Sequence, residues 1–312
     1  MYGLTRIGYG WVEYLLGAPL VGNGQARPVS PSSVGAGPQN WLLLAEPLKH
    51  RVVAFGPEGM LRRNWSVPPA PGCSASVPVD VCQRPDGKLV VSDAGGRCVT
   101  LLDPEGREPP LFLGRPAKGT GLFGAVERVG TDERSNVYVY DPAAARLFAF
   151  SPRGEMACSW NGSYLSRAVA GDGHLFWLDS FPGRGYWLMR APQGGGFSPR
   201  CEAYYPLGER REGREITGGE VLGRDDVDRY CLALEQRDAS GARWVEIVLV
   251  GQKGRVDASV MSRIEPDELP EPPLRSLAMR ANGTVYRLAL AGSEVRIHRL
   301  EPGLAGLVPS GR

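Results

Sequence analysis

Acids followed four or five residues later by an arginine recur along this chain, each pair separating two apolar runs. The pairs are Glu46–Arg51, Asp93–Arg97, Asp141–Arg146, Asp179–Arg184 and, with a longer gap, Glu235–Arg243. Guanidinium groups donate hydrogen bonds to carboxylates and phosphates, so a ring of these hinges is able to form a polar recognition surface. The candidate binding residues are Lys49, His50, Arg51, Arg97, Arg146 and Arg184.

A structural interpretation of the same pairs competes with this one. Each acid is able to accept hydrogen bonds from the backbone of its own hinge, while the arginine pairs with the acid or with the neighbouring repeat. The repetition favours the structural role, because a catalytic group does not need to be copied along the chain. No catalytic residue is predicted from this pattern.

The hinges belong to a longer repeat. The stretch KLVVSDAGGRCVTLLDPEG (88–106) has the same layout as WLLLAEPLKHRVVAFGPEG (41–59) and NVYVYDPAAARLFAFSPRG (136–154). Aligned on the turn glycine, the units end at Gly59, Gly106, Gly154, about Gly194, Gly254 and Gly303. A spacing of this order, with several strands per unit, is typical of β-propeller blades.

Each unit is predicted to contain four strands. Its inner strands are nearly continuous apolar runs, as expected for a sheet buried on both faces, and its fourth strand mixes polar and apolar residues, as expected at an outer edge. The sixth unit lacks a fourth strand, whereas GWVEYLLG (10–17) precedes the first unit. We therefore expect residues 11–16 to pair with the last blade and close the ring. The alternative is a free N-terminal arm that docks on a partner.

The resulting prediction is a single all-β domain over residues 1–312, a six-bladed β-propeller of four-stranded antiparallel blades. Residues 1–24 supply the closing strand and its lead-in, 25–303 the six blades, and 304–312 a C-terminal tail. The pattern GKLVVSDAGGRCVTLLDPEG resembles the NHL-type repeat, strongly over about half of the chain and in layout over the rest. The resemblance implies the six-bladed fold. It does not select a function, because that family covers protein binding, RNA binding, sensor domains and a few lyases and lactonases.

Metal chemistry has few candidates. His50, His174 and His298 fall at different points of their units, which argues against the convergence that a zinc site requires. The acids of DERSN (132–136) and GRDDVD (223–228) could hold a divalent cation, but Asp and Asn in such turns usually bond to the local backbone. The sequence contains no G-x-S-x-G, P-loop or H-E-x-x-H motif. No metal ligand or cofactor is predicted, and calcium or zinc at the channel mouth stays open as the alternative.

Composition limits the partners. A formal net charge of +2 argues against nucleic acid or an anionic membrane as the main partner. No run approaches the ~20 apolar residues of a membrane span, and Glu13 interrupts the one stretch that could resemble a signal peptide. The compartment stays open, including a secreted or particle-associated location. The excess of arginine over lysine indicates a high-GC, bacterial genome, and the six cysteines show no zinc-like spacing.

The function expected from these features is a non-catalytic scaffold that presents loops to a protein partner or to neighbours in a larger assembly. The alternative is a metal-dependent enzyme of the lactonase or lyase propeller type. The fifth unit is the longest and contains PLGERREGREITGGE (206–220), which we expect to project from the disc as an insertion for a partner. A solvated, self-paired charge run is the other interpretation. The residues of this candidate insertion are Arg210, Arg211 and Arg214.

Overall fold

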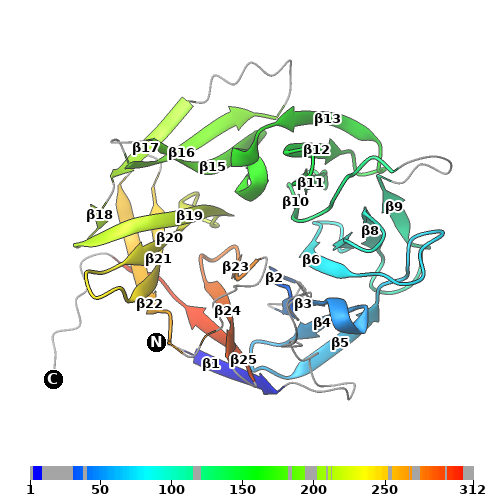
Figure 1. The fold of residues 1–312 in the computed structure, drawn as a ribbon, viewed down its shortest axis with the longest axis horizontal. Coiled ribbons are helices and arrows are strands. Elements are labelled where there is room, and N and C mark those ends of the chain that lie inside the picture. The colour runs from blue at the N-terminus through cyan, green and yellow to red at the C-terminus, as the bar shows by residue number, and fades with distance from the viewer. Residues whose placement is uncertain are drawn as a thin grey trace.

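Both faces of the inner strands are buried, because successive residues of a strand point to opposite faces of a sheet and each face packs against a neighbouring blade. The computed structural model of the protein describes residues 3–8, 31–37, 41–114, 121–181, 185–193, 202–208, 210–211, 213–251, 255–266, 268, 275–291 and 294–304. Their strands form six antiparallel sheets arranged as blades around a central channel (Figure 1). The predicted six-bladed all-β propeller is therefore confirmed.

The strands are given from the channel outward. Blade one consists of β2 (Ser33–Ala36), β3 (Leu42–Glu46), β4 (Arg51–Phe55) and β5 (Leu61–Ser66). Blade two consists of β6 (Pro78–Gln83), β7 (Leu89–Asp93), β8 (Cys98–Leu102) and β9 (Leu111–Leu113). Blade three consists of β10 (Val129–Thr131), β11 (Val137–Asp141), β12 (Arg146–Phe150) and β13 (Met156–Asn161). Blade four consists of β14 (Val169–Gly171), β15 (His174–Phe181), β16 (Gly185–Pro192) and β17 (Glu202–Gly208). Blade five consists of β19 (Arg214–Arg224), β20 (Tyr230–Arg237), β21 (Arg243–Val250) and β22 (Val256–Arg263). Blade six consists of β23 (Leu277–Met279), β24 (Val285–Ala291), β25 (Glu294–Leu300) and β1 (Gly3–Gly8). Short 3-10 turns lie at Pro47–Lys49 and Ser163–Arg167.

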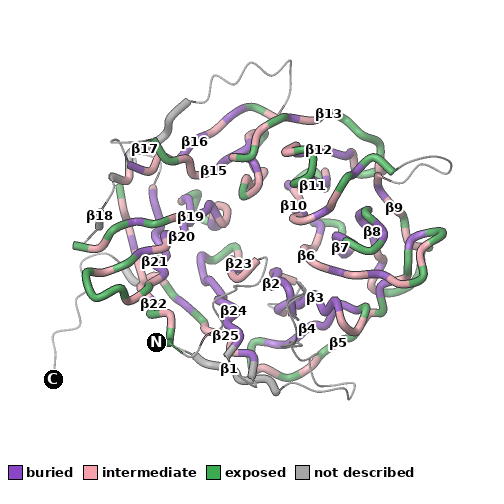
Figure 2. The backbone as a smooth tube through the Cα atoms, viewed as in Figure 1, coloured by how far each residue is buried: buried purple, intermediate pink, exposed green. Residues whose placement is uncertain are grey.

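The core consists of separate apolar clusters, one in each gap between neighbouring blades. Leu42 and Leu44 of β3 pack against blade six, whereas Leu43 and Ala45 of the same strand pack against blade two. The other four gaps are filled in the same way by alternating residues of the second and third strands. Figure 2 shows this burial concentrated in the inner strands. The blades are thus held together by side-chain packing rather than by a shared sheet.

The links between strands fall on two opposite faces of the disc. The hinges between the second and third strands, together with the loops that enter each blade, form what we call the hinge face. The turns between first and second strands and the Pro-x-Gly turns between third and fourth strands form the turn face. Gly59, Gly106 and Gly154 of the Pro-x-Gly turns have φ values of 81°, 68° and 87°, a region that favours glycine. The outer strand β5 is largely exposed, as predicted for a fourth strand.

An N-terminal strand closes the ring, but it lies nearer the chain end than expected. Strand β1 pairs antiparallel with β25, from Gly3 opposite Arg299 to Gly8 opposite Glu294. Residues 11–16, which the sequence favoured, lie outside the described residues. The position that β1 fills is an outer edge, and the mixed polarity of its sequence GLTRIG is like that of the fourth strands of the other blades. At the opposite end of the chain, β26 (Gly303–Leu304) pairs with β22.

The described residues of the segment 206–220 form strands rather than an irregular loop, and its role as an insertion for a partner stays a prediction. Residues up to Gly208 complete β17, β18 (Arg210–Arg211) pairs with the start of β19, and Arg214 begins β19 itself. Strand β19 is eleven residues long, so most of the extra length of the fifth unit extends its inner strand. In the part of the chain that the structure describes, no helix is long and apolar enough to cross a membrane.

Candidate functional site

The hinge acids are held inside the disc. Glu46 and Asp93 are 0% exposed, and Asp141 is 1% exposed. Asp141 accepts backbone hydrogen bonds from Ala143 and Ala144 in its own hinge, at 2.9 and 3.2 Å, which is the predicted local role. It also accepts the N–H groups of Gly124 and Ala125, at 2.8 and 3.1 Å, in the loop that enters the same blade. Asp141 therefore fastens two segments of backbone.

Asp93 repeats this arrangement in blade two. Its Oδ1 accepts the N–H of Gly95 in the hinge at 3.0 Å and the N–H of Val77 in the entering loop at 2.6 Å. Glu46 in blade one instead forms a buried ion pair with Arg51. Arg51 is thus a structural partner rather than an exposed donor, and its side chain is 7% exposed.

The arginines of successive hinges are not at equivalent positions. Glu46 pairs with Arg51 and Asp141 pairs with Arg146 in the strand register, but Asp93 pairs with Cys98. Arg97 therefore lies one position earlier, level with His50 and Ala145. These three residues share a positive φ of 47° to 53°, which is unusual for residues other than glycine. This conformation directs Arg97 and His50 outward, and both are exposed.

In the hinges of blades one to three the acids are buried, whereas basic groups are exposed: Arg97 and His50 are exposed, and Lys49 and Arg146 are partly exposed. Arg167 on the neighbouring loop is 47% exposed and lies 3.8 Å from the carboxylate of Glu235 in blade five, which is 44% exposed. Arg146 donates to Asn161 Oδ1 at 2.7 Å. Burial and the nearby charge of Arg51 lower the pKa of Lys49 from its usual value, although Glu46 opposes them. The predicted hinge residues of blades one to three thus share one surface.

The remaining predicted residues lie elsewhere. Arg184 falls outside the described residues. Arg210 and Arg211 are placed only as the backbone of β18. The guanidinium of Arg214 stacks over the ring of Trp244 at 4.9 Å from the ring centre, and that of Arg263 lies 5.9 Å from the same ring. The side chain of Arg214 is therefore held by stacking on Trp244 within blade five, and this contact requires no partner molecule.

Ion pairs across the central channel were not predicted from the sequence. Arg275 precedes the inner strand of blade six, yet it binds Asp80 of blade two at 2.8 Å and donates to the carbonyl of Val129 in blade three at 2.6 Å. Asp80 is 0% exposed, and its Oδ2 also accepts the N–H of Val129 at 2.9 Å. Arg275 therefore connects the entry to blade six with blades two and three, which are not neighbours of blade six in the ring.

A second pair crosses the channel at a similar depth. Arg128 of blade three binds Glu220 of blade five. Burial alone would raise the pKa of Glu220, but the charge and hydrogen bond of Arg128 outweigh it, so the pKa lies below its usual value. We call these four residues, Asp80, Arg128, Glu220 and Arg275, the channel plug.

Strand register places the plug near the hinge face. Asp80 lies opposite Ser92, the residue before the hinge acid of β7. The carbonyl of Arg128 accepts the N–H of Tyr140, the residue before the hinge acid of β11. The only sequence signal for the plug was Asp80 itself, a charge inside the otherwise apolar strand VDVC (79–82).

Glu127 lies beside the plug and has an unfavourable charge. Burial raises its pKa, Arg128 partly opposes this, and the Asp80 carboxylate adds to it. Since the folded-state pKa is above the unfolded value, ionised Glu127 opposes folding at neutral pH, and this penalty disappears as the pH falls below the unfolded value of about 4.3. We expect Glu127→Gln to raise the thermal unfolding midpoint at pH 7 and to have almost no effect at pH 4. A pH-independent difference in scanning calorimetry would contradict this account.

Below the plug, a cavity of about 350 Å³ occupies the channel. All six inner strands line it, with Gly35, Cys82, Gly130, Gly171, Glu220 and Ala278 among the lining residues. Burial raises the pKa of the Cys82 thiol to about 12, so this thiol is protonated at neutral pH.

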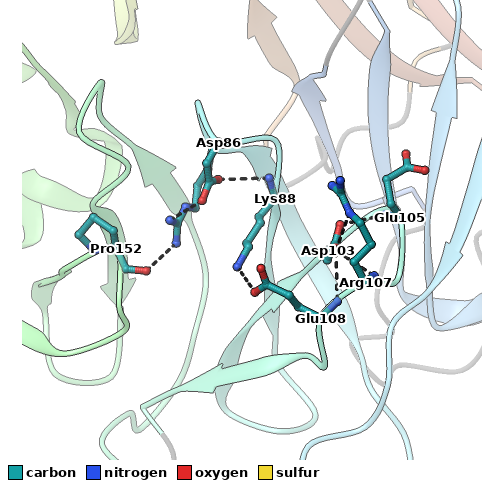
Figure 3. A network of polar contacts seen from close by, with 8 residues as sticks. Asp86, Lys88, Asp103, Glu105, Arg107, Glu108 and Pro152 are labelled. Carbon is teal, nitrogen blue, oxygen red and sulfur yellow. Dashed lines mark hydrogen bonds and ion pairs between the residues drawn. The ribbon is translucent and has the colours of Figure 1, made fainter.

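The acids of the turn face also accept hydrogen bonds from the backbone of their own turns. Asp132 Oδ1 accepts the N–H groups of Arg134 and Asn136, and Asp225 Oδ1 accepts those of Val227 and Arg229. These acids of DERSN and GRDDVD therefore make their turns, as the sequence favoured. Figure 3 shows a further turn-face network in which Lys88 pairs with Glu108 at 2.5 Å, while Asp103 accepts backbone N–H groups.

Arg84 connects two blades within that network. It donates to Asp86 at 2.6 Å and to the carbonyl of Pro152, in blade three, at 3.1 Å. His50, His174 and His298 lie in blades one, four and six. Burial and the charge of Arg287 lower the pKa of His298 to about 4. Across the described ranges, no group of three or more His, Cys, Asp and Glu side chains is arranged to hold a metal ion.

Comparison with known proteins supports the architecture. No family model matches the sequence, and no curated protein matches it. Among solved structures, the chain is similar to a streptogramin B lyase (TM-score 0.51, 10% identity, 97% of this chain and 98% of that chain covered). It is also similar to virginiamycin B lyase from Staphylococcus aureus (TM-score 0.50, 8% identity, 96% and 100% covered). A gluconolactonase from Xanthomonas campestris has a TM-score of 0.46 at 13% identity over 87% of each chain. Likeness at these identities shows the propeller fold alone, and the NHL-type resemblance stays a prediction.

Proposed function

We propose that this chain is a non-catalytic β-propeller that binds an acidic surface of a partner protein through its hinge face. The observation that carries the proposal is the opposite placement of the two charge types in the hinges. The acids Glu46, Asp93 and Asp141 are buried and bonded, whereas Arg97 and His50 are exposed. A partner therefore meets donors on this face.

The rigidity of the hinge face supports the same function. Hinges and entering loops are tied to each other by Asp93 and Asp141, and the His50 imidazole contacts the carbonyl of Ser76 in the next entering loop. Groups that are held in place before binding lose less conformational entropy when they bind. The channel plug completes the surface, because its ion pairs cross the channel near that face. A closed, rigid, basic face fits a docking function.

Charge reversal on the two faces tests this proposal. The hinge-face variant is Arg97→Glu with Arg146→Glu, and the matched turn-face variant is Arg134→Glu with Arg153→Glu, so both have the same net charge. The probe is poly-L-glutamate at low salt, measured by calorimetry. We expect roughly tenfold weaker binding for the hinge-face variant, equivalent to about 1.4 kcal/mol, and little change for the control.

Three results would count against the proposal. Equal losses in the two variants would mean that net charge, not the hinge face, determines binding. Tighter binding of poly-uridylate than of poly-L-glutamate would favour nucleic acid over protein. Stoichiometric calcium or zinc in the purified protein would favour the alternative of a metal-dependent lactonase-like or lyase-like enzyme.

A further inference from the structure

The channel cavity is separate from the hinge face and carries its own inference. Its volume of about 350 Å³ lies within the range of small-molecule sites. The plug crosses the channel at the hinge end. At the turn-face end, Arg224 and Glu133 line the cavity, and the ion pair of Arg224 with Asp172, at 3.0 Å, joins neighbouring blades around the rim rather than spanning the channel. The geometry therefore points to entry from the turn face.

The buried charges of the cavity form two matched ion pairs, Arg128 with Glu220 and Arg275 with Asp80. At the rim, Arg224 pairs with the exposed carboxylates of Asp172 and Asp228, and the exposed Glu133 also lines the cavity, so these rim charges face solvent. A ligand with a net charge would bring an uncompensated charge into a largely buried space, which is costly. A ligand with separate donors and acceptors but no net charge matches these pairs.

Polar and aromatic groups between the two ends add specific contacts. Gln83 and Thr131 line the wall, and the rings of Tyr140, Phe176 and Tyr230 supply apolar surface. We propose that the channel cavity binds a neutral or zwitterionic small molecule, entering from the turn face.

Gly130 provides the variant that tests this site. It lines the cavity from β10, and a Cβ atom added there would meet no heavy atom within 4 Å. Gly130→Phe is therefore expected to fill the cavity while leaving the thermal unfolding midpoint near that of the wild type, because aromatic residues favour strands. Gly130→Leu is the smaller substitute if the phenylalanine variant does not fold. Gly35 offers a contrast, since its added Cβ would lie 2.3 Å from the carbonyl oxygen of Val81.

The experiment is a ligand-observed NMR screen of wild type and Gly130→Phe against small polar compounds of every charge class. L-Glutamine, L-glutamate and L-lysine form a set matched in size with net charges of zero, minus one and plus one. We expect the compounds that bind wild type but not Gly130→Phe to be net-neutral, with matched charged compounds binding at least about tenfold more weakly.

Two outcomes would overturn the inference. In the first, charged compounds lose binding to Gly130→Phe as often as net-neutral compounds do. In the second, no compound binds the wild type and Gly130→Phe differently. The hinge-face proposal is independent of both, because Gly130→Phe should bind poly-L-glutamate as the wild type does. Failure of the cavity site and failure of the hinge-face function are thus separable.

Discussion

Replacing Asp141 with alanine is expected to lower the free energy of unfolding by about 4 kcal/mol, because four backbone N–H groups lose a buried, charged acceptor. The donors are Gly124, Ala125, Ala143 and Ala144, at 2.8 to 3.2 Å. Asp141 is 1% exposed, so water does not replace it without rearrangement. Urea unfolding followed by tryptophan fluorescence measures the change.

Two other hinge acids serve as graded controls for that prediction. Asp93 accepts the backbone N–H groups of Val77 and Gly95, so Asp93→Ala should cost about 2 kcal/mol. Asp179 is partly exposed and accepts the N–H of the adjacent Ser180, so Asp179→Ala should stay within about 0.5 kcal/mol. Similar losses for all three variants would show that the number of fastened N–H groups does not set the stability.

The hinge acids also show how far sequence reasoning reaches. Their burial and local hydrogen bonds follow from a repeated acid at the end of an apolar strand, and the repeat was enough to predict six blades. The bond from Asp93 to Val77 was not predictable in the same way, because it joins residues 16 positions apart in the chain. The position of Arg97 within its hinge was also predicted wrongly, because the sequence pattern does not reveal which hinge residue adopts a positive φ.

The channel plug was even less predictable from the sequence. Arg128 and Glu220 are 92 residues apart in the sequence, and they come from blades that are not neighbours. Such a pair forms only after the ring has brought its inner strands around one axis, so no local pattern encodes it. The closing strand was misplaced for a related reason. An outer edge strand needs backbone pairing more than an apolar pattern, and the short β1 has little in its sequence to distinguish it.

Arg275→Met is expected to destabilise the protein by about 3 kcal/mol, because Asp80 then stays buried without its counterion. Asp80→Asn should cost less. Its amide oxygen still accepts the N–H of Val129, and the Arg275 side chain, which is 19% exposed compared with 0% for Asp80, is better able to reach water. The difference in cost between Arg275→Met and Asp80→Asn follows from the different exposure of the two side chains rather than from the strength of their ion pair.

The double variant Asp80→Asn with Arg275→Met separates the pair from its two members. A buried ion pair that is removed as a whole costs much less than one broken on one side, so the double variant should recover about half or more of the loss caused by Arg275→Met. The measurement is a double-mutant cycle by urea unfolding at pH 7. Strictly additive losses would mean that Asp80 and Arg275 act independently, and this ion pair would then not couple blades that are not neighbours in the ring.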